Sequence, residues 1–436
     1  MKSKHLDEVR SEIISEIINF IKNEKKIKRI ILIDDLFGSL HAIAWLENGS
    51  DKNLLKKFNE RLNEIATPFW AENLWNASNG NESDKLLFEY AWKEGQKQDD
   101  EDRFRLVERH RNRGAWLGHF STPPWDIDEK NPPIIVFYSF KGGVGRTTAL
   151  ASFAIKQARA GDSVVIIDFD LDAPGIGSLL AGDAKESSQW GVIDYLLEHR
   201  FGNNDLRDYY FACRREEIAG SGEILIIPAG QINENYVRKL VRVDFEPSSK
   251  DDERYPLNDL LLQIKNELSP QWILIDARAG ISEPAGILLT GIAHLNVLFG
   301  TFSDQSWQGL RIILNKLGAE RIHRQLPQSE CILVQAMIPE DTSVGKTAMN
   351  SFSERARDEF SNYYYSEDPE DQDEDKYWYI RDLEDSSAPH VPIYLTYQPK
   401  LAQFEKIDDV ADSLVDSKDY SDLAKRITMR VKWREP

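Results

Sequence analysis

The chain has 436 residues, which is enough for two or three domains or for one large α/β domain with additions. Its net charge of −19 disfavours a protein that coats nucleic acid, because such proteins gather Lys and Arg to displace counterions, and it suits a protein that works on other proteins or on small ligands. Two cysteines, Cys213 and Cys331, are too few for a disulfide or metal framework, so we expect a cytoplasmic protein.

Residues 1–130 are predicted to form a mainly helical accessory domain. Helical spacing of apolar side chains marks three segments in it: 6–21, 54–65 and about 84–95. The stretch KRIILIDDLF, residues 28–37, predicts one strand. Its acidic pair would suit a receiver domain, but a receiver needs four further buried strands, and residues 36–120 show none clearly.

A proline-rich stretch, STPPWDIDEKNPP at residues 121–133, separates this region from the rest of the chain. Beyond it, helical stretches separate seven short apolar runs: PIIVFYS, SVVIID, EILIIP, WILID, NVLFGTF, CILVQAM and VPIYL. Strands buried on both faces have this pattern, so residues 131–436 predict an α/β domain built on a doubly wound, mainly parallel sheet. Between the last two runs, at about 340–390, lies SEDPEDQDEDK, which predicts a solvated acidic insertion.

The stretch VFYSFKGGVGRTTALASFA, residues 136–154, has the order of a phosphate-binding loop: a buried strand, a glycine-rich turn and a helix. The glycines let backbone N–H groups surround phosphate oxygens, and the helix N-terminus adds its positive end. Thr147 is placed to give its hydroxyl to Mg²⁺, and Thr148 to reach a phosphate. The predicted nucleotide-contacting residues of the loop are Lys141, Gly142, Gly143, Val144, Gly145, Arg146, Thr147 and Thr148.

Carboxylates follow two of the other predicted strands. Asp168 and Asp170 end the run VVIIDFD, and because they are two residues apart they point to one side of extended backbone. Asp276 follows four apolar residues in WILIDARAG. The carboxyl ends of parallel strands meet at one edge of a sheet, so we expect all three carboxylates to face the phosphate loop and Mg²⁺.

With these motifs, the chain after the proline-rich stretch resembles the deviant Walker A ATPases, the MinD/ParA group of the SIMIBI class of P-loop proteins. That group carries xKGGxGK[ST], an acidic pair after the second strand and D-x-P-A-G after a later one, and the matching stretches here are 141–148, 168–170 and 276–280. Two residues depart from the pattern: Arg146 replaces the loop lysine, and Arg278 stands where proline is usual.

The resemblance implies a role for each of several residues. Lys141 would cross a face-to-face dimer interface to the partner subunit's phosphates, and Arg146 would contact the β- and γ-phosphates of its own nucleotide. Asp170 would orient the attacking water. Gln335 sits where the group often has an adenine-contacting asparagine. The implied catalytic residues are Lys141, Asp170 and Arg146, and the implied metal-organising residues are Thr147, Asp168 and Asp276.

These roles imply an ATP- and Mg²⁺-dependent ATPase that forms a homodimer through its nucleotide face and recruits or regulates a protein partner. Chains with the KGGVGR variant are often linked to phage-defence loci, so antiviral defence is an expected setting. Three alternatives stay open. A scaffold without turnover would result if the planar guanidinium of Arg146 moves the γ-phosphate out of line. A DNA-segregation ATPase is disfavoured by the charge. A tyrosine kinase would use the clusters NYYYSEDP and DKYWY, for which packing is the favoured explanation.

No membrane association is expected. Residues 1–12 are too polar for a signal peptide, and the most apolar window, 284–302, is interrupted by Gly291, His294 and Asn296. The basic C-terminal stretch LAKRITMRVKW predicts a docked terminal element rather than a surface-bound helix, because Thr428 and Arg430 break its apolar face.

Overall fold

The computed structural model divides the chain into two compact units, Met1–Asn112 and Arg113–Pro436, and we describe each by itself. The structure describes residues 5–35, 38–47, 52–98, 101–109, 114–117, 121–128, 130–181, 188, 190–201, 205–213, 215–243, 245, 256–340, 342–367, 377–402, 404 and 406–432.

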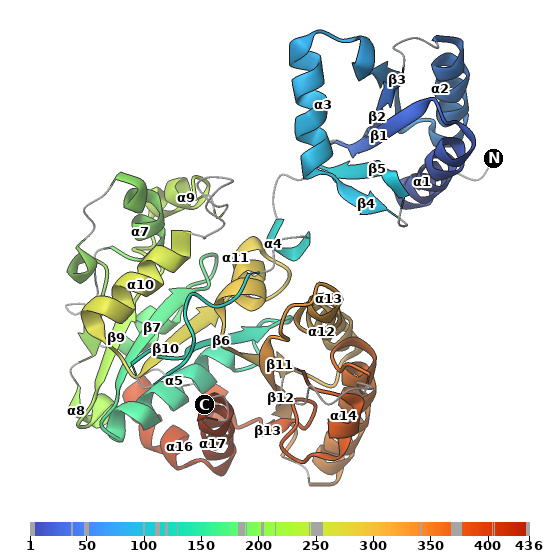
Figure 1. Cartoon of the computed structure of the whole chain (residues 1–436). Coiled ribbons are helices and arrows are strands. Elements are labelled where there is room, and N and C mark those ends of the chain that lie inside the picture. Colours follow the sequence, from blue (N-terminus) through green and yellow to red (C-terminus); the bar gives the residue numbers. More distant parts are fainter. Residues whose placement is uncertain are drawn as a thin grey trace. The chain divides into compact units, whose positions relative to one another are not determined.

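The first unit is built on a mixed five-stranded sheet in the order β3-β2-β1-β5-β4. Its strands are β1 (Ile27–Asp34), β2 (Leu40–Leu46), β3 (Trp70–Asn76), β4 (Gln96–Gln98) and β5 (Glu101–Glu108). Its main helices are α1 (Leu6–Asn23), α2 (Lys52–Ala66) and α3 (Glu82–Glu94). Helices α1 and α2 pack on one face of the sheet, and α3 covers the other (Figure 1).

The expectation of a mainly helical N-terminal domain was therefore wrong, although its three helices and the strand β1 lie where the spacing placed them. Strand β5 was not predicted from the sequence because it contains several charged residues. Arg103 donates to the carbonyl oxygen of Ile21 at 2.9 Å, and Arg105 lies 5.1 Å from the ring centroid of Trp92, so arginines stand in a strand that also buries apolar side chains. The pairing of β1 with β2 is antiparallel, which also excludes the all-parallel sheet of a receiver domain.

The second unit contains an eight-stranded sheet in the order β13-β12-β11-β6-β10-β7-β9-β8. The strands are β6 (Ile134–Ser139), β7 (Ser163–Phe169), β8 (Phe211–Cys213), β9 (Glu223–Ile227), β10 (Trp272–Ala277), β11 (Leu295–Gly300), β12 (Glu330–Ile338) and β13 (Ile393–Thr396). All seven predicted strands are present and run parallel, and the additional β8 pairs antiparallel with β9. The predicted α/β class with a doubly wound, mainly parallel sheet is confirmed for this unit.

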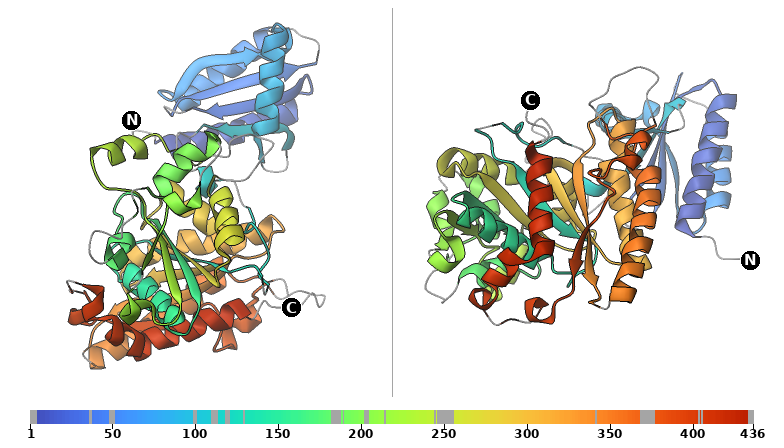
Figure 2. Two further views of the ribbon diagram at one scale, coloured as in Figure 1. Left: turned by 90° about the vertical axis from the view of Figure 1, so that its left-hand side faces the viewer. Right: turned by 90° about the horizontal axis from the view of Figure 1, so that it is seen from below.

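Helices cover both faces of this sheet (Figure 1, Figure 2). One face carries α7 (Val192–Glu198), α10 (Pro256–Leu268), α11 (Glu283–Ile287), α12 (Asp304–Leu317) and α14 (Thr342–Tyr363). The other carries α5 (Arg146–Arg159), α6 (Ile176–Ala181), α16 (Ala411–Asp416) and α17 (Lys418–Lys432). Short helices α4 (Gly114–Leu117), α8 (Glu216–Ala219), α9 (Glu234–Leu240), α13 (Ala319–His323) and α15 (Pro399–Ala402) complete the unit. None of the helices in the described part of the chain is long and apolar enough to span a bilayer.

The segment at 340–390 is not a solvated insertion over most of its length. Residues 342–363 form the 22-residue helix α14, whose Phe352, Ala356 and Phe360 are fully buried at a four-residue spacing. The helix was missed because this single buried stripe is flanked by polar residues. Most of the acidic run SEDPEDQDEDK lies outside the described residues.

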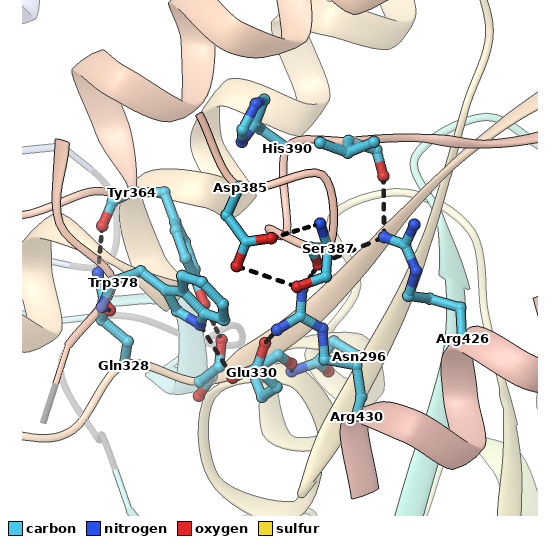
Figure 3. Close-up of polar contacts among 12 residues, drawn as sticks. Asn296, Gln328, Glu330, Tyr364, Trp378, Asp385, Ser387, His390, Arg426 and Arg430 are labelled. Atoms are coloured by element: carbon cyan, nitrogen blue, oxygen red, sulfur yellow. Dashed lines mark hydrogen bonds and ion pairs between the residues drawn. The ribbon is translucent and has the colours of Figure 1, made fainter. Parts of the chain in front are cut away.

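A buried polar network packs the chain on either side of that acidic run (Figure 3). Glu330 accepts a hydrogen bond from the Trp378 indole at 3.1 Å, and the guanidinium of Arg430 lies 4.6 Å from the Trp378 ring centroid. Tyr364 donates to the carbonyl oxygen of Ser329 at 2.9 Å. Two tyrosines of the first cluster and the Trp–Tyr pair of the second are buried in this packing, and α17, which supplies Arg430, is a docked terminal helix as expected.

Candidate functional site

The glycine loop leads from the end of β6 into α5 with the geometry of a phosphate cradle. Gly143 and Gly145 have φ angles of 73° and 80°, which side-chain-bearing residues rarely adopt. An added Cβ at either position would meet nothing within 4 Å, so backbone conformation rather than space requires glycine there. Helix α5 begins at Arg146, and its N–H groups therefore face the loop.

The strand-end carboxylates lie at the same edge of the sheet. Asp276 of β10 is in register with Asp168 of β7, and both side chains are almost fully buried. The Asp168 carboxylate accepts hydrogen bonds from the backbone N–H groups of Gly175 at 3.1 Å and Asp170 at 3.3 Å, so it shapes the loop after β7. Burial raises the pKa of Asp168 to about 7, helped by the negative charge of Asp276.

Arg146 turns inward onto the other two carboxylates. Its Nε donates to Asp276 Oδ1 at 2.6 Å and its Nη2 to Asp170 Oδ2 at 2.8 Å. Thr147 donates from its hydroxyl to Asp276 Oδ2 at 2.7 Å, so both oxygens of Asp276 are engaged. Burial raises the pKa of Asp276, and the contacts with Arg146 and Thr147 oppose that shift.

A cavity of about 840 Å³ opens over these residues, and it falls within the usual size range of small-molecule sites. Its lining includes the loop from Gly142 to Thr148 and Asp170. Other lining residues were not predicted from the sequence: residues 395–398, Leu401, Phe404 and Tyr420. The end position of β13 signals the first of these, but Tyr420 is brought in by the docking of α17, which no local pattern shows.

Four predicted site residues do not line this cavity: Asp168 and Asp276, which are almost fully buried, and Lys141 and Gln335. Lys141 is exposed and is absent from the lining, and it makes no hydrogen bond or ion pair with another described residue. Gln335 is buried on β12, where its side-chain N–H donates to the carbonyl oxygen of Ala348 at 3.2 Å. It lines a second cavity of about 600 Å³, and Met337 lies on the wall of both cavities. The structure thus brings together Arg146, Thr147, Thr148, Asp168, Asp170 and Asp276, but not Lys141 or Gln335.

The site suits a nucleotide with a magnesium ion. The cradle offers backbone N–H groups to phosphates, and the hydroxyl of Thr147 and the carboxylate of Asp276 are the hard oxygen ligands that Mg²⁺ prefers. Among the described residues no three His, Cys, Asp or Glu side chains gather as a metal site. In proteins Mg²⁺ is usually held by one or two carboxylates while phosphates and waters complete its coordination.

A strand, a glycine loop and a helix facing strand-end carboxylates on a doubly wound sheet define a P-loop nucleotide-binding domain. Residues 135–351, just under half of the chain, match the family model of the CobQ/CobB/MinD/ParA nucleotide binding domain. The resemblance predicted from the sequence is therefore supported for residues 135–351, which match a nucleotide-binding domain of the MinD/ParA type.

Several known proteins are similar to this chain at low identity. An uncharacterized ATP-binding protein of Methanocaldococcus jannaschii is 25% identical over 240 residues, which cover 50% of this chain and 79% of that protein. A second such protein of the same organism is 23% identical over 231 residues, covering 49% and 76%. Among solved structures, pNOB8 ParA bound to nonspecific DNA is 19% identical, with a TM-score of 0.43 over 70% of this chain and 100% of that one.

Proposed function

We propose that this protein is an ATP-hydrolysing dimerisation switch that recruits or regulates a partner protein. The observation that carries the proposal is the opposite placement of its two unusual loop cations. Arg146 is buried on the carboxylates of its own site, whereas Lys141 is exposed and lies outside its own cavity. A cation in that position is available to the phosphates of a second copy of the chain.

Each group in the site would have its own role in phosphate transfer. The loop amides would hold the phosphate chain, and Thr147 would present its hydroxyl to the metal. Asp170 would accept a hydrogen bond from the attacking water and aim it along the line of transfer. Bound Mg²⁺ would offset negative charge on the β- and γ-phosphates. To reach those phosphates, the Arg146 guanidinium has to leave at least one of its two carboxylate partners.

A second candidate function, a nucleotide-binding scaffold without turnover, is favoured by the same arginine. While Arg146 donates to Asp170, that carboxylate has one oxygen fewer for positioning water. A guanidinium that remained there after nucleotide binding would leave the site occupied and inactive.

Light scattering and phosphate release test the two candidates together. The wild-type protein with Mg²⁺ should double its mass in ATP and not in ADP, and it should release phosphate steadily. Asp170→Ala should keep ATP-dependent dimers while lowering turnover on the order of a hundredfold. A protein that stays monomeric in ATP contradicts the switch, and dimers without phosphate release favour the scaffold.

A setting in antiviral defence remains a prediction from the sequence variant. Genes adjacent to this one provide its check. A neighbouring nuclease or other toxic effector would support defence, and a centromere-binding protein would point instead to DNA segregation.

A further inference from the structure

The rim of the nucleotide cavity contains an ion pair between two different loops. Arg278, directly after β10, bonds through Nη1 to Oδ2 of Asp172, in the loop after β7. Both residues line the cavity. Because β10 is the neighbour of both β7 and β6, the pair joins two loops at the sheet edge where the phosphate cradle begins.

The cavity holds charged side chains of both signs. Its charged lining among the described residues comprises Arg146, Arg278, Asp170 and Asp172. Arg146 is buried and is shared by two carboxylates, so it is not readily released. Among the described residues Arg278 pairs with Asp172, and the side chains of that pair are 38% and 40% exposed. Exposed pairs of this kind contribute little stability, so Arg278 can exchange its partner at low cost.

The backbone beneath Arg278 is held in place, so an exchange requires only a side-chain movement. Gly280, at a φ angle of 79°, donates to the carbonyl oxygen of Ser139 at 3.1 Å and accepts from the Tyr138 hydroxyl at 3.0 Å. Ser282 caps α11, and the Trp116 indole donates to the Ser282 carbonyl oxygen at 2.6 Å. The loop is thereby fixed beside the strand that carries the phosphate cradle.

We infer that Arg278 contacts the terminal phosphate of a bound nucleoside triphosphate, and that Asp172 is its resting partner. A triphosphate brings several negative charges to the cavity that Arg278 lines, and it offers the paired oxygens that a guanidinium binds in a fork. A diphosphate presents less charge and ends earlier, so it leaves Arg278 on Asp172. Arg278 is then the residue by which one subunit distinguishes the triphosphate from the diphosphate. This inference rests on the proposed nucleotide binding.

Calorimetric titration of the full chain tests this inference. The ligands are Mg·ATP, a slowly hydrolysed ATP analogue and Mg·ADP. Arg278→Ala should weaken binding of the triphosphates roughly ten- to a hundredfold and change ADP affinity less than about threefold. Arg278→Lys should recover part of the loss. Asp172→Asn removes the competing partner and should strengthen ATP binding about threefold while leaving ADP unchanged. Arg159→Ala is the matched control, because it removes an arginine paired with an exposed aspartate at the far end of α5.

The outcomes distinguish this inference from the proposed nucleotide binding on which it rests. If the wild-type protein binds neither nucleotide, both are overturned. If it binds both, and Arg278→Ala lowers ATP and ADP affinity equally, Arg278 does not read the terminal phosphate and only the inference falls. A thermal melt establishes that each variant is folded. Should Arg278→Ala fail to fold, Asp172→Asn decides, and unchanged or weaker ATP binding by that variant contradicts the inference.

Discussion

Arg146 donates from Nε to Asp276 at 2.6 Å while its Nη2 donates to Asp170 at 2.8 Å, so one guanidinium joins the ends of two neighbouring strand–loop connections. A lysine could not match this geometry, because its single ammonium has no planar fork with two separated donors. The replacement at this position therefore changes the resting state of the carboxylates, and not only the contact with phosphate.

Arg146→Lys should raise ATP hydrolysis severalfold with little change in ATP affinity. The substitution keeps the positive charge but releases one of the two carboxylates, which frees Asp170 to position water. Phosphate release and calorimetric titration measure the two quantities. Turnover at or below the wild-type rate would show that the arginine fork does not restrain Asp170.

Asp276→Ala should abolish Mg²⁺-dependent ATP binding and also destabilise the fold. The sequence alone places this residue at a strand end and predicts that its loss weakens Mg·ATP binding much more than it destabilises the fold. The structure buries it against Arg146, and removing one partner of a buried pair costs about 3 kcal/mol. Urea titration measures the stability loss. Asp276→Asn, which keeps the shape, is the comparison, and equal stability of the alanine variant and the wild type would contradict the buried pair.

Lys141→Ala should bind ATP with wild-type affinity and fail to dimerise. The lysine is exposed and does not line its own cavity, so its loss should leave monomer binding intact. Light scattering in ATP reports the dimer, and titration with the variant reports affinity. Lys425→Ala, in an exposed pair with Asp422, controls for loss of a surface charge. Weakened monomer affinity would make Lys141 an ordinary loop lysine that serves its own phosphates.

His390 should make the protein less stable in acid. Burial lowers the pKa of this imidazole to about 4, and Arg357 adds to the shift. The unfolded chain, with a pKa near 6.5, then binds more protons than the folded chain between about pH 4 and 6.5. The unfolding free energy therefore falls as pH drops through that window, by roughly 1–3 kcal/mol.

Urea titrations at pH 7 and pH 5 measure that loss. His390→Asn should show a smaller difference between the two pH values, although it also loses the 2.7 Å contact between Nδ1 and the Tyr365 hydroxyl. Tyr365→Phe keeps the imidazole while removing the same contact, so it should retain the pH dependence. An equal pH dependence in the wild type and His390→Asn would rule out the histidine as its cause.

The central features of the nucleotide domain could be predicted because a short stretch of sequence specifies each of them. Strands buried on both faces are apolar throughout, and the carboxylates at 168 and 276 mark where two of them end. Parallel register then brings the two carboxylates together. The glycines at 143 and 145 fix the loop because their φ angles exclude other residues. None of these inferences requires knowledge of distant contacts.

The features that could not be predicted from the sequence depend on contacts between distant segments. Gln335 lies in the expected strand, but β12 shifts register between Gln335 and Ile338, and Met337 adopts a φ of 61°. A shift of this kind changes which face of a strand each side chain occupies, and local composition does not reveal it. In the first unit, β2 reads LHAIAWL and its small alanines gave too weak an apolar signal to mark a strand. Three-residue strands such as β8 are too short for any periodicity.

The indole of Trp116 donates to Ser282, the residue that caps α11, four positions after Arg278. It also packs against Gly286, where an added Cβ would lie 2.7 Å from the indole nitrogen. A side chain larger than glycine at 286 would therefore displace the indole and disturb the contact that holds the loop after Arg278.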